Sequence, residues 1–237
     1  MAVDVNKVYR AVLSILNKES RGFLTPDQFN KIGRQVQLDI FEKTFYDYNR
    51  ALNRKKSNVI NTEYADIPKN IKEKIDIFSK EDALVITTGV APVPSDLYRV
   101  LNIYTSNRTI NIQEVNKSDL SYINASKLTA PSASYPVYYR EGSNIKIFPT
   151  TISSASMDYV KMPADPLWNY SSGVNGSYSF NSTTHNTNPS VNFELHESDE
   201  VNLVIKILAY TGVLIKDPAI VQAASQEENK IIQLENQ

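Results

Sequence analysis

The residue types that most often carry out chemistry are sparse in this sequence. Its 237 residues include two histidines, His185 and His196, and no cysteine. A zinc site would need both histidines together with carboxylates, because thiolates, the other common zinc ligands, are absent. His185 lies in a segment rich in Asn, Ser and Thr, and His196 precedes an expected helix. We therefore interpret both histidines as surface residues and predict no metal site.

An acidic group, Glu197, Asp199 and Glu200, could in principle supply acid–base chemistry. These residues stand where a helix is expected to begin, and the helix dipole stabilises negative charge there. The chain lacks Gly-x-Ser-x-Gly, Walker and dinucleotide-binding motifs, and its 7 glycines leave little material for a phosphate loop. We predict no catalytic residues, no enzymatic activity and no cofactor. A hydrolase whose carboxylates the fold brings together is the alternative that the sequence leaves open.

Aromatic residues indicate binding rather than catalysis. Many of the 14 tyrosines fall in expected strands, where they fit either ordinary sheet packing or a protein-binding surface. The 22 residues from 169 to 190 contain 16 Asn, Ser, Thr or Gly residues and no Asp, Glu, Lys or Arg. This composition predicts a loop, and the aromatic residues in and beside it favour a loose hairpin. Loops of this length in compact domains are usually functional or mobile. The candidate contact residues in and beside this segment are Trp168, Tyr170, Tyr178 and Phe180.

A basic cluster ends a long expected helix, and it contains Arg50, Arg54, Lys55 and Lys56. Positive charge suits the C-terminal end of a helix dipole, so a solvated helix end is one interpretation. Contact with a phosphate backbone is the other, and for that reason Arg50 and Arg54 are candidate contact residues. The net charge of −1 argues against nucleic-acid binding through bulk charge.

Periodicity predicts the elements that must position these residues. Apolar residues recur at helical spacing in 4–17 and 25–54, and Thr25 to Gln28 form a capping box with Pro26 at the first helical position. A third helix is expected from Asp66. The remaining predictions are strands at 84–88, 97–104 and 156–162, a hairpin of 135–140 with 144–149 across Gly142, and a short helix near 118–126.

The stretch from Phe193 to Lys216 is expected to organise the core. Residues 191–196 alternate between apolar and polar, which predicts a strand, and residues 201–215 are apolar on nearly every side. Such a helix is normally buried on several sides. Polar residues interrupt it too often for a membrane span. Asp217-Pro218 should end it and begin a last helix that reaches residue 235.

Composition and element order together predict an α+β fold. Hydrophobic residues make up 41% of the chain and charged residues 22%, as in globular proteins. The missing cysteines and the lack of a signal-type N-terminus favour folding in the cytoplasm. The predicted elements are helices at both ends of the chain and antiparallel strands between them. The predicted boundaries are 1–80, 81–196 with the long loop 169–190, and 197–237, whose helices pack back on the N-terminal ones.

Several short stretches stand in a characteristic order along the chain. They are Leu24-Thr25-Pro26-Asp27-Gln28-Phe29-Asn30, Pro94-Ser95-Asp96-Leu97-Tyr98-Arg99, Leu128-Thr129-Ala130-Pro131 before Tyr135-Pro136-Val137-Tyr138, Ile145-Lys146-Ile147-Phe148-Pro149, Asp158-Tyr159-Val160-Lys161-Met162-Pro163 ending in Trp168, and Phe193-Glu194-Leu195-His196-Glu197-Ser198 before the apolar helix and Asp217-Pro218.

In this order, the stretches resemble the head-to-tail connector proteins of short-tailed bacteriophages, with the closest likeness to the ring proteins of crAss-like phages. The likeness covers most of the chain. None of the stretches is a catalytic motif, so their order carries the resemblance. At the strand-to-helix junction the family tends to have Leu-Pro-Glu-Ser, and here His196 replaces the proline.

The resemblance implies a structural virion protein with a helical bundle, built from the N-terminal and C-terminal helices, and a β-rich antiparallel middle domain. The sequence leaves open whether the helices at the two ends form one bundle or dock on separate subunits. The protein would assemble in the host cytoplasm as a closed ring between head and tail. The ring is expected to be twelve-fold like the portal, with the portal and other ring or tail proteins as partners and no membrane anchor. DNA would pass through its channel without sequence-specific binding. The alternative is a carbohydrate- or protein-binding module of a virion or cell-surface assembly, with Tyr138 and Trp168 as reader residues.

Overall fold

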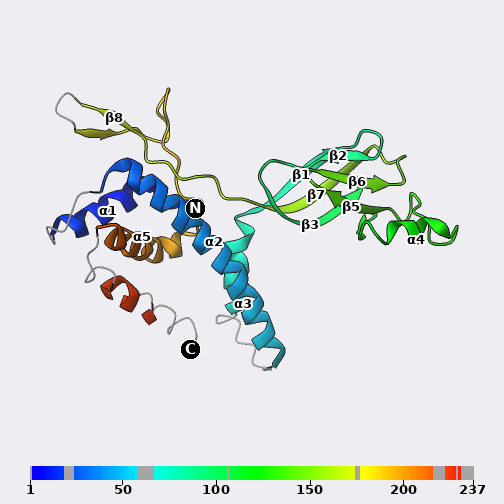
Figure 1. Ribbon diagram of the computed structural model, residues 1–237, viewed down its shortest axis with the longest axis horizontal. Coiled ribbons are helices and arrows are strands. Elements are labelled where there is room, and N and C mark those ends of the chain that lie inside the picture. The colour runs from blue at the N-terminus through cyan, green and yellow to red at the C-terminus, as the bar shows by residue number, and fades with distance from the viewer. Residues whose placement is uncertain are drawn as a thin grey trace. The chain divides into compact units, whose positions relative to one another are not determined.

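The structure is a computed structural model that describes residues 2–18, 24–57, 67–105, 107–173, 177–215, 222–227 and 229–230. Its fold is mixed α+β with antiparallel sheets, as the sequence predicts (Figure 1). The chain divides into a helical unit, Met1–Ile77 with Pro163–Gln237, and a β unit, Phe78–Met162. The sequence predicts one β-rich domain over 81–196, whereas residues 163–196 group with the helices in the structure.

The helical unit contains the α-helices α1 (Val5–Lys18), α2 (Pro26–Ser57), α3 (Ile67–Asp76) and α5 (Glu200–Ile215). Helix α5 contacts both α1 and α2, and α2 also contacts α3. The predicted capping box is present, because the N–H of Gln28 donates to Thr25 Oγ1 and the N–H of Thr25 donates to Gln28 Oε1. Asp66, the expected start of α3, lies outside the described residues. The expected last helix is described only at 222–227 and 229–230, which are helical.

Helix α5 supplies much of the helical core. Leu203 and Ile207 are fully buried on it, while Lys206 is 8% exposed and forms an ion pair with Asp39 of α2. The predicted burial on several sides is present, because the buried residues Leu203, Leu208 and Thr211 stand at positions that a helix of 3.6 residues per turn spreads around its axis. Val201 and Tyr210 are exceptions, with 65% and 44% of their surface exposed. An apolar sequence therefore reaches the surface of this unit.

The expected strand at 191–196 keeps its alternation but forms no regular ladder. Phe193 and Leu195 are buried, and the unit pairs these residues only through the isolated bridges Val3↔Phe193 and Leu167↔Val191. A side chain also binds this segment in place of a neighbouring strand, because the N–H of Glu194 donates to Gln37 Oε1. Gln37 is itself buried and also donates to the carbonyl of Ala164.

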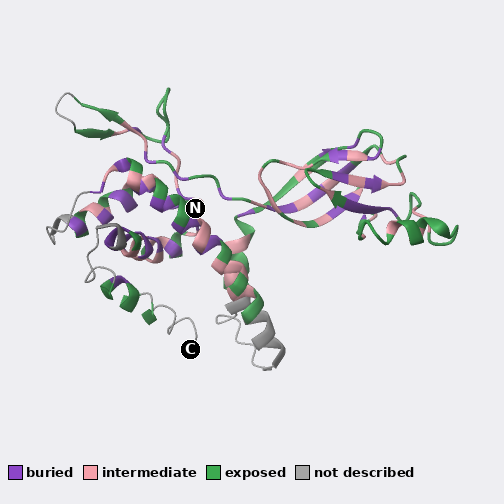
Figure 2. Ribbon diagram, viewed as in Figure 1, coloured by how far each residue is buried: buried purple, intermediate pink, exposed green. Residues whose placement is uncertain are grey.

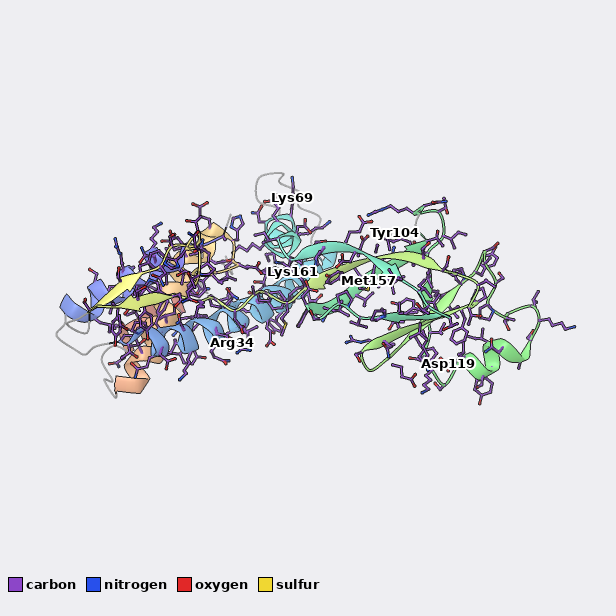
Figure 3. All side chains as sticks on the ribbon, turned by 90° about the horizontal axis from the view of Figure 1, so that it is seen from above. Arg34, Lys69, Tyr104, Asp119, Met157 and Lys161 are labelled. Carbon is purple, nitrogen blue, oxygen red and sulfur yellow. The ribbon has the colours of Figure 1, made fainter. Side chains whose placement is uncertain are left out.

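The β unit consists of two sheets around one apolar core. One sheet has the order β1 (Ser79–Val85), β7 (Ser154–Lys161), β3 (Leu97–Thr105), and the other β2 (Val90–Pro92), β6 (Asn144–Phe148), β5 (Val137–Glu141), β4 (Gln113–Glu114). All these pairs are antiparallel except β4 with β5. The short helix α4 (Leu120–Ala125) lies between β4 and β5. Fully buried core residues include Ile103, Ile145, Ile147, Met157 and Tyr159, and Figure 3 labels Met157 within the unit.

The predicted hairpin is confirmed as β5 and β6, whose last pair is Glu141↔Asn144. Gly142 has a φ of +60° in the two-residue turn, a conformation that glycine adopts without strain. The first strand was expected at 84–88, and the structure has it at 79–85. The charged residues Lys80 to Asp82 interrupt the apolar pattern from which the start of a strand is predicted. Tyr159 accommodates one of them, because its hydroxyl lies 3.1 Å from Asp82 Oδ2 and 3.0 Å from Asp96 Oδ1.

We expect Ile207→Asp to unfold the protein. An unpaired carboxylate in this fully buried position costs several kcal/mol, about the net stability of a domain. Val201→Asp is the matched control on the same helix, and its exposed site should tolerate the charge. Thermal unfolding followed by circular dichroism checks both variants. A cooperative transition of Ile207→Asp near the wild-type temperature would contradict the assigned core.

A second prediction concerns acid stability of the β unit. Hydrogen bonds from Lys117 and Lys146 lower the pKa of Glu141 from its ordinary 4.5 to about 2. The folded state then binds fewer protons, so this contribution is complete above about pH 4.5 and disappears as the pH falls toward 2. Glu141→Gln should flatten the pH dependence of stability between these values. A carboxyl NMR titration of Glu141 with a midpoint near 4.5 would show that the two lysines do not hold it.

Candidate interaction site

The sequence-predicted contact segment forms a projecting arm, defined here as residues 168–190 and described at 168–173 and 177–190. Strands β8 (Tyr170–Ser172) and β9 (Tyr178–Phe180) pair antiparallel, with Tyr170 opposite Phe180 and Ser172 opposite Tyr178. The predicted loose hairpin is therefore present. In Figure 1 this ribbon stands away from helices α1 and α2 of its own unit.

Trp168 fixes the root of the arm. Its ring centroid lies 4.4 Å from that of Tyr9 on α1, and its indole Nε1–H donates to Asn6 Oδ1 over 3.1 Å. Asn30 of α2 binds the Trp168 backbone on both sides, accepting from its N–H at 2.8 Å and donating to its carbonyl at 3.2 Å. With 4% of its surface exposed, Trp168 is an internal anchor, in contrast to the partner-contact role expected from sequence.

Aromatic rings continue from this root in two directions. Along the arm, Trp168 stacks on Tyr170 at 5.8 Å, and Tyr170 meets Tyr178 edge-on at 4.8 Å. Phe180 contacts Trp168 at 5.6 Å from the opposite strand. Toward the core, Tyr9 meets Phe29 at 4.9 Å. Each aromatic pair contributes about 0.5–1.5 kcal/mol beyond its buried area, so the ribbon is held by rings as much as by its few backbone bonds.

The polar residues of the arm also have structural roles at its base. The N–H of Asn169 donates to Ser190 Oγ at 2.9 Å, and the N–H of Asn181 donates to the carbonyl of Asn169, also at 2.9 Å. Ser171 Oγ adds a 2.9 Å hydrogen bond to Asn181 Oδ1. Further along, His185 Nδ1 accepts from the N–H of Asn188 at 3.2 Å and so closes a turn. The Asn- and Ser-rich composition thus builds a defined base.

Among the described residues, no further strand pairs with either edge of the ribbon. Backbone bonds join 169 with 181 and 173 with 177, so the register directs the backbone groups of Ser172, Tyr178 and Phe180 away from the partner strand. Natural edge strands are usually protected by charges, proline or bulges. Residues 169–181 contain no charged residue and no proline, whereas β1 carries the run Lys80 to Asp82 and β3 has two register shifts.

The predicted contact residues differ in how far their side chains are exposed to solvent. Tyr178 is 41% exposed at the outer end of the aromatic series, while Tyr170 and Phe180 are half-buried. Arg50 is exposed on α2, and the side chain of Arg54 lies outside the described part of the chain. Arg50 lies 20 residues beyond Asn30 on the same helix, which is about 30 Å at 1.5 Å per residue. The basic cluster and the arm are therefore separate surfaces.

The acidic group before α5 ties helices together. Asp199 forms a 2.7 Å ion pair with Lys74 of α3, and Glu200 forms a 2.8 Å pair with Lys7 of α1 that raises the pKa of the lysine. His196 Nδ1 accepts from the N–H of Ser198 at 3.2 Å, which caps the turn.

Across the described residues, no group of three or more His, Asp or Glu side chains could hold a metal ion. Nor do these residues include a helix of the length and hydropathy that a membrane crossing needs.

Sequence reasoning missed the residues that receive Trp168. Asn6 and Asn30 read as ordinary polar positions on helix surfaces, and nothing in helical periodicity marks their side chains as partners of a distant loop. Comparison with models of known protein families and with curated proteins gave no match for this chain. The case for an interaction site therefore rests on the geometry of the arm.

Replacing the anchor should loosen the arm and destabilise the helical unit. Trp168→Ala removes a buried ring, which typically costs about 3–5 kcal/mol. Tyr178→Ala removes a partly exposed ring and should cost about 1 kcal/mol or less. Urea unfolding of both variants measures the difference. Because Trp168 is the single tryptophan, its fluorescence also reports directly on the root in the Tyr178→Ala protein. Equal losses of unfolding free energy in the two variants would contradict the assignment of Trp168 as the anchor and Tyr178 as a surface residue.

Proposed function

We propose that this chain is a structural virion protein, one subunit of a ring in the portal-to-tail connector through which a phage genome passes. The observation that carries the proposal is the arm, an uncharged aromatic ribbon with open edges that is anchored at one end by Trp168. Such a surface suits contact with another protein subunit. The resemblance to phage connector proteins indicates the kind of assembly, a ring between the portal and the tail.

The chemistry of the arm supports protein binding. Tyr, Ser, Asn and Gly dominate residues 169–190, and the same residue types dominate antibody paratopes. Tyrosine offers a large contact area with little loss of conformational freedom, and hydroxyl and amide groups adapt to the partner. The absence of charged side chains between 169 and 190 means that docking would desolvate no ion.

The proposed subunit has a helical bundle from the terminal helices and a β-rich middle domain. Supporting this, α5 contacts both α1 and α2 although 142 residues, 58–199, lie between the end of α2 and the start of α5. In a ring of twelve such subunits, the near-neutral chain would let DNA slide, because strong binding to phosphates requires a surplus of Lys and Arg. Arg50 and Arg54 are the proposed points of weak contact with the phosphate backbone.

The alternative function, a carbohydrate- or protein-binding module, needs different reader residues from those expected. Tyr138 is 5% exposed and Trp168 is 4% exposed, so neither ring is free to stack on a ligand. Tyr122 and Tyr135 of the β unit, 79% and 80% exposed, are the tyrosines that could serve. Glycan-array binding that is lost on Tyr122→Ala would favour this alternative.

Native mass spectrometry of the purified chain, alone and with candidate portal protein, tests the connector proposal. We expect a discrete closed ring, formed either spontaneously or only with the portal. A chain that stays monomeric in both conditions would overturn the proposal. Tyr178→Asp should abolish ring formation because it places a charge on the arm. Tyr210→Asp is the matched control, since Tyr210 is similarly exposed, at 44% against 41%, but lies on α5.

A further inference from the structure

The β unit carries an apolar surface that no described part of that unit covers. We define the tip as residues 117–136, the excursion between β4 and β5 that contains α4. Leu128, Tyr135 and Tyr122 are 94%, 80% and 79% exposed, and they are the three most exposed large hydrophobic residues in the described chain. No residue of α4 is buried. The tip is green over most of its length in Figure 2, and Figure 3 labels Asp119 near its beginning.

Hydrogen bonds give the tip a defined shape. At its start, Asn116 Nδ2 donates to Asp119 Oδ2 at 3.0 Å, and Lys117 forms an ion pair with Glu141 of β5. In the middle, Thr129 Oγ1 donates to the carbonyl of Ile123 at 2.9 Å. Before β5, Ser132 and Tyr135 exchange backbone hydrogen bonds, although the sequence analysis had placed Tyr135 in a strand. A surface that is already ordered loses less entropy on binding.

The tip and the arm share an unusual chemistry. The tip contains three charged residues, Lys117, Asp119 and Lys127, of which Lys117 is paired with Glu141 and Asp119 accepts from Asn116, and residues 169–190 contain no Asp, Glu, Lys or Arg. Both segments are rich in Ser and Tyr, and both expose tyrosine rings. Elsewhere the β unit presents ion pairs such as Arg108–Glu81 and Lys146–Glu141. A ribbon without charged side chains matches a surface with few of them, because little charge must be desolvated when the two make contact.

We infer that the arm of one copy of this chain docks on the tip of the next copy. This inference deepens the proposed function and rests on it. The arm and the tip are different surfaces that every copy carries once each, so the contact is heterologous and leaves one free arm and one free tip after each addition. Repetition of such a contact gives a closed ring when the rotation between neighbouring copies closes, and an open filament otherwise, whereas arm-to-arm or tip-to-tip contacts would stop at a dimer.

A mixing experiment tests the inference under the conditions in which the wild-type chain assembles. The arm variant is Tyr178→Asp, and the tip variant combines Tyr122→Asp with Leu128→Asp. All three side chains are exposed, so both variants should fold, as circular dichroism can verify. Each variant alone should be a monomer by native mass spectrometry. An equal mixture should give a 1:1 dimer of twice the monomer mass, because it contains one intact arm and one intact tip.

Other results would overturn the inference. A tip variant that assembles like wild type would show that the tip is not an interface. An arm variant that dimerises alone would indicate tip-to-tip contact. A mixture that stays monomeric while wild type assembles would reject arm-to-tip docking and leave the ring proposal intact. If wild type assembles neither alone nor with the portal, the proposed function fails, and the inference fails with it.

Discussion

The attachment of Trp168 to two helices is the contact on which the candidate site depends. An uncharged ribbon of two three-residue strands has too few backbone bonds to be stable in water by itself. The buried indole supplies what the ladder lacks, because it packs on Tyr9 and is bound on both backbone sides by Asn30. The arm can therefore keep its edges open and its outer tyrosine exposed while its direction is set from inside the helical unit.

A comparable constraint operates in the β unit, where acidic residues sit inside a strand. Glu81 and Asp158 lie directly opposite each other, an arrangement of like charges that destabilises a sheet. The hydroxyl of Tyr104 lies 2.7 Å from Glu81 Oε1 and 2.9 Å from Asp158 Oδ1, and Arg108 pairs with Glu81 at 2.6 Å. Tyrosines that read as strand formers in the sequence thus also act as hydrogen-bond partners for carboxylates. Burial together with Glu81 and Asp158 raises the pKa of Tyr104, and burial together with Asp96 and Asp82 raises the pKa of Tyr159.

Local sequence signals predicted local structure well. The capping box at Thr25 and the glycine turn at Gly142 depend on neighbours in the chain, and both are present. Predictions failed where distant residues decide the outcome. The apolar pattern of α5 could not show that Val201 and Tyr210 face outward, and alternation at 191–196 could not show that Gln37 would replace a neighbouring strand. The arm was predictable as a loose hairpin, but its anchor was not, because Asn6 and Asn30 are single polar residues on helices.

The chain enters the β unit at strand β1 and leaves it after strand β7, and these two strands pair with each other. Ser79 of β1 lies opposite Val160 of β7, and the N–H of Lys161 donates to the carbonyl of Phe78 at 2.8 Å. The two ends of this 85-residue unit are therefore neighbours, as is common for domains that are inserted into loops of other domains. Such an arrangement makes the unit modular. Recombination could exchange it for another domain with adjacent ends while residues 1–77 and 163–237 keep their own core.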